Sequence, residues 1–413
     1  MRKPESARPQ GTAVVVTRWM RRSVVTIVTV HGLIHFLGAA KGFDLASPTQ
    51  LQSPISASVG ALWLFAGLST LSAAVMMGVQ SERWWAAAAF AALFSQAVVM
   101  TSWSDAKGAT VVNVGLLLVG AHGFLTYGPW SDEAQWERRV RSTPNNTAEA
   151  ARGVVTEADL ERLPAPLAGY LRVSGAVGLP RVASFYAVVH GRIRSGPDKR
   201  WMTFTGKQFN TYGAAPPRRL FLMHAVMFGV PVSVLHIFSG VASMRARLLG
   251  LVPVMAASGS DMTRAETVTL LNDLVVLAPA AIVDAPMDWL PLNEHMVVGT
   301  IRIGEQTVSA TLTFDAEHRL VCFVSDDRLR ASRDGKSFIR QRWSTPIRRF
   351  SRAGGRLIAV DGEARWHSSG REGVFSYLEF SVDGITYDPD TAHLGAAIES
   401  VRQEHRLPVR HQS

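Results

Sequence analysis

Cysteine and, over one long stretch, charge are scarce in this chain of 413 residues. The single cysteine, Cys322, excludes an internal disulfide bond and any metal cluster held by several cysteines. Residues 23–128 contain almost no charged side chains, and most of the charge follows residue 130. An uncharged segment of this length predicts a membrane domain, and the remainder of the chain has room for one or two further domains.

Phosphate-binding and hydrolase motifs are also missing. No glycine-rich phosphate loop follows a predicted strand, and no G-x-S-x-G sequence is present. The net charge of +10 is not accompanied by a basic run interleaved with aromatic residues. We therefore expect the basic residues to set the orientation of the chain in the membrane and to lie at the membrane surface. We expect no nucleic-acid partner.

Four apolar runs are present instead, each close to the roughly 20 residues that a helix needs to cross the hydrocarbon core. They cover residues 23–42, 55–79, 84–103 and 109–128. The first run is not a cleavable signal, since it is long and three more runs follow it. The sequence therefore predicts an N-terminal all-α bundle of four transmembrane helices in a bacterial cytoplasmic (inner) membrane.

Basic residues near the ends of these runs indicate the orientation of the chain. No basic residue lies between residues 43 and 54, whereas the segments before the first run and after the fourth run are rich in arginine. This bias favours a cytoplasmic N-terminus, and an even number of crossings then puts the C-terminal region on the same side. The flanking residues are Arg2, Lys3, Arg8, Arg18, Arg21 and Arg22 before the first run, and Arg138, Arg139 and Arg141 after the fourth.

The C-terminal region has the pattern of a soluble α+β domain with an antiparallel sheet and one main helix. A further apolar run at 220–256 is interrupted by Pro231, Arg245 and Arg247, so we assign it to strands and not to a membrane span. A capping box at Thr263–Glu266 predicts the start of the main helix, which Pro279 should end. The expected strands are 184–194, 200–209, 220–226, 233–241, 243–251, 296–303, 307–314, 320–325, 356–366 and 374–387. The expected organisation is a basic tail (1–22), the membrane domain (23–128), a linker (129–160), the α+β domain (161–390) and a weakly ordered tail (391–413).

Two histidines in the first apolar run, His31 and His35, share one face of a helix because they are four residues apart. We estimate the depth of each side chain in the membrane from the helix rise, counted from the predicted cytoplasmic end of its helix. His31 then lies level with His122, and His35 lies level with Gln96. Asn113 lies slightly further from the cytoplasm. Hydrogen bonding that holds the bundle together is the favoured role. A proton, quinone or metal site, or one ligand of a haem, is the alternative.

The outer turn between the last two runs contains Asp105 and Lys107. We expect an ion pair between them, or capping of the following helix by Asp105. A charged gate is the alternative for this pair.

At these residues the chain resembles a family of bacterial four-helix integral membrane proteins followed by a C-terminal domain of unknown function. The resemblance rests on the sequence HGLIHFLGAAKGF, Trp63, Ser95, Gln96, Trp103–Lys107 and Asn113, and later on Gly240–Arg245, Glu266–Leu271, Phe314, Asp315, Asp327 and Arg328. The C-terminal pattern is similar to the lipoprotein-carrier (LolA/LolB-like) half-barrel, which implies a curved sheet around an apolar cavity. Such half-barrels usually lie outside the cytoplasm, opposite to the side that the charge distribution favours.

The leading functional hypothesis is therefore not enzymatic: the C-terminal domain binds a lipid or another apolar ligand. A membrane redox or proton-handling protein that uses His31, His35 and His122 is the alternative, and a structural scaffold is a third class. Aromatic residues and methionines could line a lipid cavity, although an ordinary core is the favoured interpretation. They are Phe185, Tyr186, Trp201, Met202, Phe204, Phe221, Met223, Met227, Phe228, Trp289 and Phe323.

Overall fold

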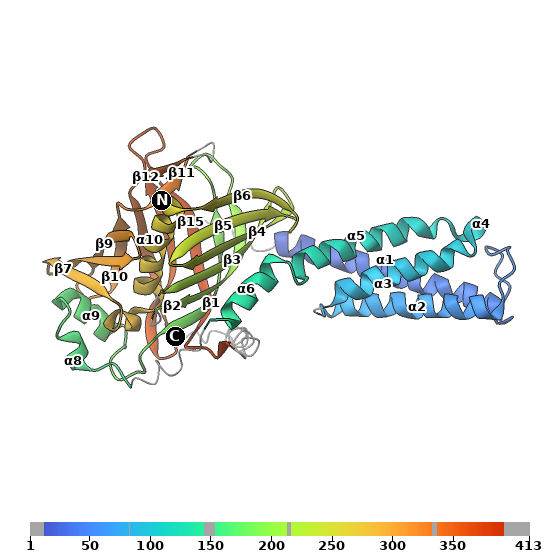
Figure 1. The fold of residues 1–413 in the computed structure, drawn as a ribbon, viewed down its shortest axis with the longest axis horizontal. Coiled ribbons are helices and arrows are strands. Elements are labelled where there is room, and N and C mark those ends of the chain that lie inside the picture. Colours follow the sequence, from blue (N-terminus) through green and yellow to red (C-terminus); the bar gives the residue numbers. More distant parts are fainter. Residues whose placement is uncertain (1–11, 82, 144–152, 213–215, 333–336, 392–413) are drawn as a thin grey trace, which may run out of the picture. The chain divides into compact units, whose positions relative to one another are not determined.

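The computed structural model describes residues 12–81, 83–143, 153–212, 216–332 and 337–391, and the side chains of residues 12–18 and 20 lie outside that description (Figure 1). The chain divides into two units, Met1–Ser131 and Asp132–Ser413. The first is helical and the second is built on a large sheet.

Apolar helices make up the first unit, as the sequence predicts. They are α1 (Thr12–Gly42), α2 (Ala57–Gly78), α3 (Trp84–Met100), the short α4 (Trp103–Ala106) and α5 (Ala109–Tyr127). Three stretches are long and apolar enough to cross a membrane: Arg21–Gly42, Ala57–Gly78 and the one that begins at Ala109. The third predicted run forms a helix of 17 residues, about 25 Å long at 1.5 Å per residue.

Close contact between α1 and α2 depends on glycine. A Cβ atom added to Gly38 would lie 2.2 Å from the Trp63 ring, and one added to Gly42 would lie 2.5 Å from the Cα of Gly60. Small residues let membrane helices approach in this way, because they remove the side chain from the contact. The described part of α1 begins before residue 22, so residues predicted as a basic tail belong partly to this helix.

The second unit is an antiparallel sheet of 13 strands in the order β6-β5-β4-β3-β2-β1-β15-β14-β13-β10-β9-β8-β7. Its first half contains β1 (Ser184–Ile193), β2 (Met202–Thr211), β3 (Arg218–Met227), β4 (Val230–Ser239), β5 (Val241–Leu248) and β6 (Val252–Ser258). The rest are β7 (Met287–Asn293), β8 (Met296–Ile303), β9 (Gln306–Phe314), β10 (Leu320–Ser325), β13 (Trp343–Ala353), β14 (Arg356–His367) and β15 (Val374–Tyr387). A separate pair joins β11 (Leu329–Ala331) and β12 (Phe338–Arg340). The apolar run at 220–256 thus forms strands, as predicted.

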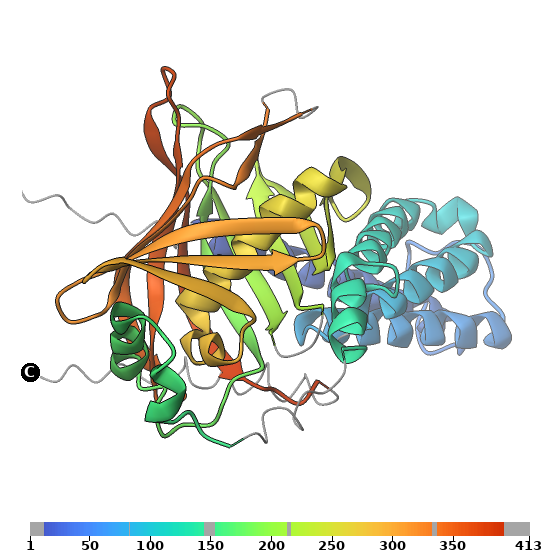
Figure 2. The same ribbon diagram turned by 60° about the vertical axis from the view of Figure 1, so that its left-hand side comes forward.

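The sheet curves around one helix, α10 (Ser260–Leu277). Within one turn of α10, Thr263 accepts a hydrogen bond from the backbone of β5 and Ser260 accepts one from Gln306 on β9. These two strands are nine positions apart in the sheet, which would be about 43 Å in a flat sheet. Figure 2 shows α10 between the green strands and the orange strands that approach it from opposite sides.

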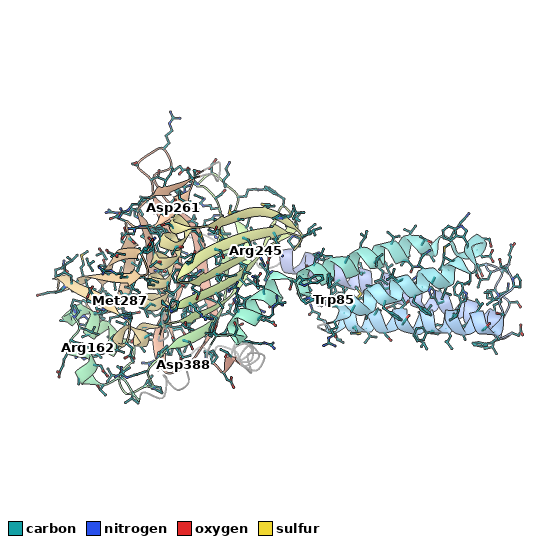
Figure 3. All side chains as sticks on the ribbon, viewed as in Figure 1. Trp85, Arg162, Arg245, Asp261, Met287 and Asp388 are labelled. Carbon is teal, nitrogen blue, oxygen red and sulfur yellow. The ribbon has the colours of Figure 1, made fainter. Side chains whose placement is uncertain are left out.

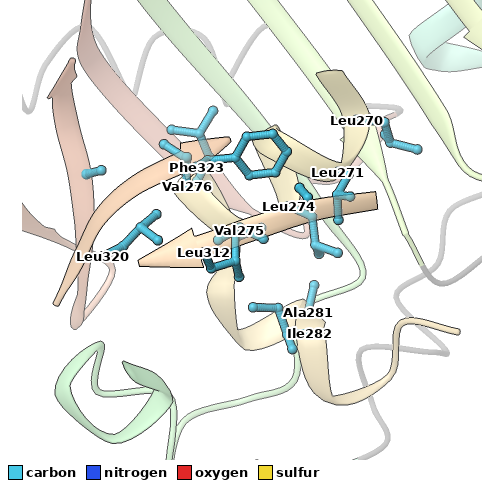
Figure 4. Packing of buried hydrophobic residues seen from close by; sticks show 14 of the residues in the cluster. Leu270, Leu271, Leu274, Val275, Val276, Ala281, Ile282, Leu312, Leu320 and Phe323 are labelled. Atoms are coloured by element: carbon cyan, nitrogen blue, oxygen red, sulfur yellow. The ribbon is translucent and has the colours of Figure 1, made fainter. Parts of the chain in front are cut away.

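Helix α10 is buried on nearly every side, and its buried residues include the charged Glu266 and Asp273 as well as apolar ones. Leu270, Leu271, Leu274 and Val275 pack in the main core against strands such as β9 and β10 (Figure 4). The helix ends at Leu277, two residues before Pro279, as predicted. Its predicted start is wrong. The helix begins at Ser260, the hydroxyl of Thr263 donates to the carbonyl of Gly259, and Glu266 binds a buried arginine instead of forming a capping box.

Residues 132–141, assigned to a linker from the sequence, form helix α6 (Asp132–Arg141) on the outer face of the sheet. Trp136 is fully buried there, and its indole nitrogen donates to the carbonyl of Leu220 at 3.2 Å. Two shorter helices follow, α8 (Glu157–Leu160) and α9 (Ala165–Val173), and a 3-10 turn (Pro279–Val283) follows α10. The predicted weakly ordered tail lies outside the described residues, apart from residue 391.

Candidate functional site

A buried polar cluster lies inside the helical unit. Nε2 of His31 lies 2.9 Å from Oδ1 of Asn113 and 3.2 Å from Oγ of Ser95, and Nε2 of His35 lies 2.7 Å from the same Oγ. Asn113 donates to Gln96 at 3.0 Å. One serine, on α3, therefore joins both histidines of α1 to the asparagine of α5.

The direction of these bonds determines which histidine nitrogen carries hydrogen. The Ser95 hydroxyl donates to Oδ1 of Asn113 at 2.8 Å, so its oxygen accepts from His35. An amide oxygen only accepts, so His31 donates from Nε2 as well. In the neutral Nε2–H form, the Nε2 atom of each ring then has a hydrogen-bond acceptor. Nδ1 of His35 is buried and has no hydrogen-bond partner among the described residues.

The predicted pairing of these histidines is wrong. His31 lies beside Asn113 and Ser95, not at the level of His122, and Gln96 bonds to Asn113 and not to His35. The depth estimate failed because it started α1 at residue 23, whereas α1 includes residues from Thr12 onward. It also assumed that the inner ends of α1 and α5 lie in one plane.

The outer turn also differs from its prediction. Oδ2 of Asp105 accepts from the backbone N–H of Ser53 at 2.7 Å, and this bond, together with the Ser53 hydroxyl, lowers the pKa of Asp105. No ion pair links Asp105 to the exposed Lys107 in the described turn, and α5 begins after Gly108 without a side-chain cap. Asp105 therefore fastens the loop between α1 and α2.

A second set of buried charges lies between α10 and the inner face of the sheet. Arg219 on β3 donates to Asp273 at 2.7 Å and to Glu266 at 2.8 Å. His236 on β4 lies 3.2 Å from Glu266, and Gln208 on β2 donates to Asp273 at 2.6 Å. The sequence did not reveal this cluster, because its members lie on different elements far apart in the chain.

Burial and charge oppose one another in this cluster. Burial alone would raise the pKa of Glu266, but the Arg219 guanidinium and His236 hold it well below its usual range. Burial raises the pKa of Asp273 in spite of the same arginine. The cluster links α10 to strands β2, β3 and β4.

Helix α6 is held on the outer face by two acidic residues in its first turn. Asp132 accepts from Arg245 at 2.8 Å and from the Ser233 hydroxyl at 2.5 Å. Glu133 pairs with Lys207 and with His224. Burial alone would raise the pKa of Glu133, but His224 and Lys207 lower it to about 2.

This docking creates a groove of about 310 Å³ between α6 and strands β4–β6. Ile237 of β4 and Ala256 of β6 line it with apolar side chains, and Arg139 of α6 and Arg245 of β5 bring guanidinium groups to it. Arg245 is labelled in Figure 3. Arg139 is exposed and forms no ion pair within the described part of the chain. The groove thus combines an apolar surface with an available cation.

Comparison with known proteins assigns the second unit to a family. The model of a family of unknown function, DUF6544, matches residues 153–380, which is more than half of the chain. The chain belongs to the DUF6544 family. The match begins after α6, so it does not include the apolar helices that resemble a membrane-protein family.

Two solved structures are similar to part of this chain. A DUF1329 family protein from Desulfovibrio piger shares 13% identity at a TM-score of 0.32, over 57% of this chain and 97% of that one. A domain from Vibrio parahaemolyticus, described as an outer membrane lipoprotein-sorting protein domain, shares 10% identity at a TM-score of 0.30, over 52% and 91%. No curated protein matches the chain. Likenesses at these TM-scores do not indicate what the DUF6544 domain binds.

Most of the aromatic residues and methionines considered for a lipid cavity lie in the packed core of the DUF6544 domain. Phe185 and Phe323 belong to the main core, Tyr186 packs near Trp136, and Phe204 packs with Met223 on the inner face. Phe228 lies outside these clusters, and 85% of its surface is exposed. No group of three or more His, Cys, Asp or Glu side chains arranged to hold a metal occurs among the residues that the structure describes.

Proposed function

We propose that this protein is an integral protein of the bacterial inner membrane whose C-terminal domain binds an anionic, amphiphilic lipid beside the bilayer. Three long apolar helices support the membrane part of the proposal. α3 is the proposed fourth crossing, since its roughly 25 Å approaches the roughly 30 Å of a hydrocarbon core. Four crossings and the arginine-rich flanks put both termini in the cytoplasm.

The groove between α6 and β4–β6 is the observation that carries the ligand proposal. Its volume of about 310 Å³ lies at the lower end of the range for small-molecule sites. The side chains of Ile237 and Ala256 suit an acyl chain, and the Arg139 guanidinium suits a phosphate or carboxylate. α6 starts after only four residues beyond α5, so membrane lipid is the amphiphile at the highest local concentration.

A titration of the full-length protein in detergent tests this proposal. The probe is phosphatidylglycerol with a fluorescent acyl chain, compared with the matching phosphatidylcholine. Arg139→Gln removes a charge-assisted bond, so we expect binding of phosphatidylglycerol to weaken about tenfold or more. Arg139→Lys should restore part of the affinity, and Arg141→Gln on the same helix is the matched control. Equal affinity of wild type and Arg139→Gln contradicts the proposal.

The proposed orientation has its own test. Reporter proteins inserted between residues 43 and 54 and fused to the C-terminus should report the periplasm and the cytoplasm, respectively. A periplasmic signal from the C-terminal fusion overturns the cytoplasmic placement without affecting the groove.

Hydrogen bonds of His31 and His35 to Ser95 and Asn113 support a packing role for the intramembrane cluster. We therefore do not favour proton or redox chemistry there. An absorption spectrum with a haem band, or stoichiometric metal in the purified protein, would reverse this preference.

A further inference from the structure

Two hairpins at one end of the sheet present apolar side chains to solvent. The β3–β4 turn is Phe228-Gly229, and the β5–β6 turn is Leu249-Gly250, followed by Leu251. Phe228 is 85% exposed and Leu251 is 56% exposed. The hairpin-tip patch consists of Phe228, Leu249, Leu251, Val252, Val254 and Met255, all exposed.

Both turns also hold an apolar residue in a strained backbone conformation. Phe228 and Leu249 have φ values of 51° and 55°, a region that favours glycine and asparagine. A turn of this kind forms more readily with a small polar residue, so folding of the hairpins does not explain Phe228 and Leu249. Phe228 and Leu249 are thus both strained in their backbone and exposed in their side chains. This combination indicates that they contact something outside the domain.

The chain enters the domain beside these tips. Asp132, the first residue of α6, bonds to Ser233 at 2.5 Å and lies 3.6 Å from Arg247. Ser233 and Arg247 lie opposite each other on β4 and β5. The next pair toward the hairpin tips is Val232 and Leu248. The backbone N–H of Leu249 donates to the carbonyl of Pro231 at 2.8 Å, which joins the two hairpins.

Only four residues separate Tyr127, the end of α5, from Asp132. A chain of that length reaches at most about 18 Å, so the tips are tied close to the membrane surface if α5 crosses the bilayer. The β1–β2 turn at the same end of the sheet adds Arg194, Lys199 and Arg200 against one acidic residue, Asp198, which lies 3.6 Å from Lys199. Basic residues beside exposed apolar ones match an anionic lipid surface.

We infer that the hairpin-tip patch inserts into the headgroup region of the bilayer, so that the DUF6544 domain is fixed to the membrane by a second contact besides α5. This inference rests on the membrane crossing in the proposed function, but it does not depend on a lipid in the groove. Phe228 and Leu251 are the side chains that would enter the apolar boundary.

Fluorescence quenching of the full-length protein in nanodiscs of phosphatidylcholine and phosphatidylglycerol tests this inference. In a Cys322→Ser background, single cysteines replace Phe228, Leu251 or, as a control in the β7–β8 turn, Glu294, and each carries the same fluorophore. Leu251→Cys keeps Phe228 in place, so the two tip labels are independent. Lipids with a nitroxide near the headgroup should quench both tip labels at least twofold more than the control label, and iodide should quench them less.

Two results would overturn the inference. Equal quenching by iodide at the tips and at Glu294→Cys means that the tips lie in water. Protection from both iodide and lipid nitroxide means that protein covers them, either the helical unit or a second copy of the chain. The reporter fusions decide separately whether α5 crosses the membrane, so failure of the tips alone leaves the proposed function standing.

Discussion

Replacing Trp136 by alanine should detach α6 from the sheet while the rest of the domain stays folded. Trp136 is fully buried between α6 and residues such as Leu220 and Leu235. Removal of a buried tryptophan costs about 3–5 kcal/mol, and loss of its hydrogen bond to the Leu220 carbonyl adds about 1 kcal/mol. We expect a loss of about 4–6 kcal/mol to detach α6 although the ion pairs of Asp132 and Glu133 remain.

Hydrogen exchange followed by mass spectrometry measures this effect in the full-length protein. Each 1.4 kcal/mol changes a protection factor about tenfold, so amides of residues 132–141 should lose about 10³-fold protection or reach the unprotected rate. Amides of α10 (260–277) should keep theirs, because α10 is enclosed by the sheet. Arg141→Ala on the exposed side of α6 is the control.

Two outcomes would refute this reasoning. Protection of α6 that stays within threefold of wild type means that Trp136 does not hold the helix. An equal loss in α10 means that Trp136 supports the whole domain and that α6 is not a separately docked element.

The remaining predictions concern charge and close packing. Glu133 has a folded pKa of about 2, which is below its unfolded value. Its ionised form therefore stabilises the fold by at most about 3 kcal/mol above pH 4.5, and this stabilisation is lost as the pH falls towards 2. Hydrogen-exchange protection of α6 should fall over that range. Gly38→Ala should lower the thermal stability of the helical unit by about 1–3 kcal/mol, because its Cβ atom would overlap Trp63. Glu266→Leu should destabilise the domain by about 3–5 kcal/mol in chemical unfolding, since Arg219 loses a buried partner.

Matched variants make each of these predictions testable. Glu133→Gln should make α6 protection insensitive to pH over the same range, and an unchanged pH dependence contradicts the assignment. Ala substitution of Gly78, which has open space around its Cβ position, should leave the bundle unaffected. Asp261→Asn removes an exposed carboxylate from α10, and a loss equal to that of Glu266→Leu would show that burial of the pair is not the cause.

Elements with strong periodicity were predictable from the sequence. Strands β8 and β9 alternate between buried and more exposed residues, and the apolar helices stand out by composition alone. Strands β6 and β7 contain Pro253 and Pro291 and lie at the two edges of the sheet, where proline is tolerated. Proline there hid both strands from a pattern-based prediction.

The polar sites could be predicted only in part. α6 was missed because its buried face consists of little more than Trp136 and Val140 within a charged decapeptide. The sequence identified His31 and His35 as buried polar residues, but not their partners, because the axial register of α1 against α5 depends on packing. Arg219 gave no signal, since its partners are far away in the chain.

Native mass spectrometry of the full-length protein, released from nanodiscs made of inner-membrane lipid, tests the central claim most directly. Wild type and Arg141→Gln should each retain one anionic phospholipid, and Arg139→Gln should lose it. Retention of the same lipid by all three proteins, or by none, would contradict a lipid site between α6 and β4–β6.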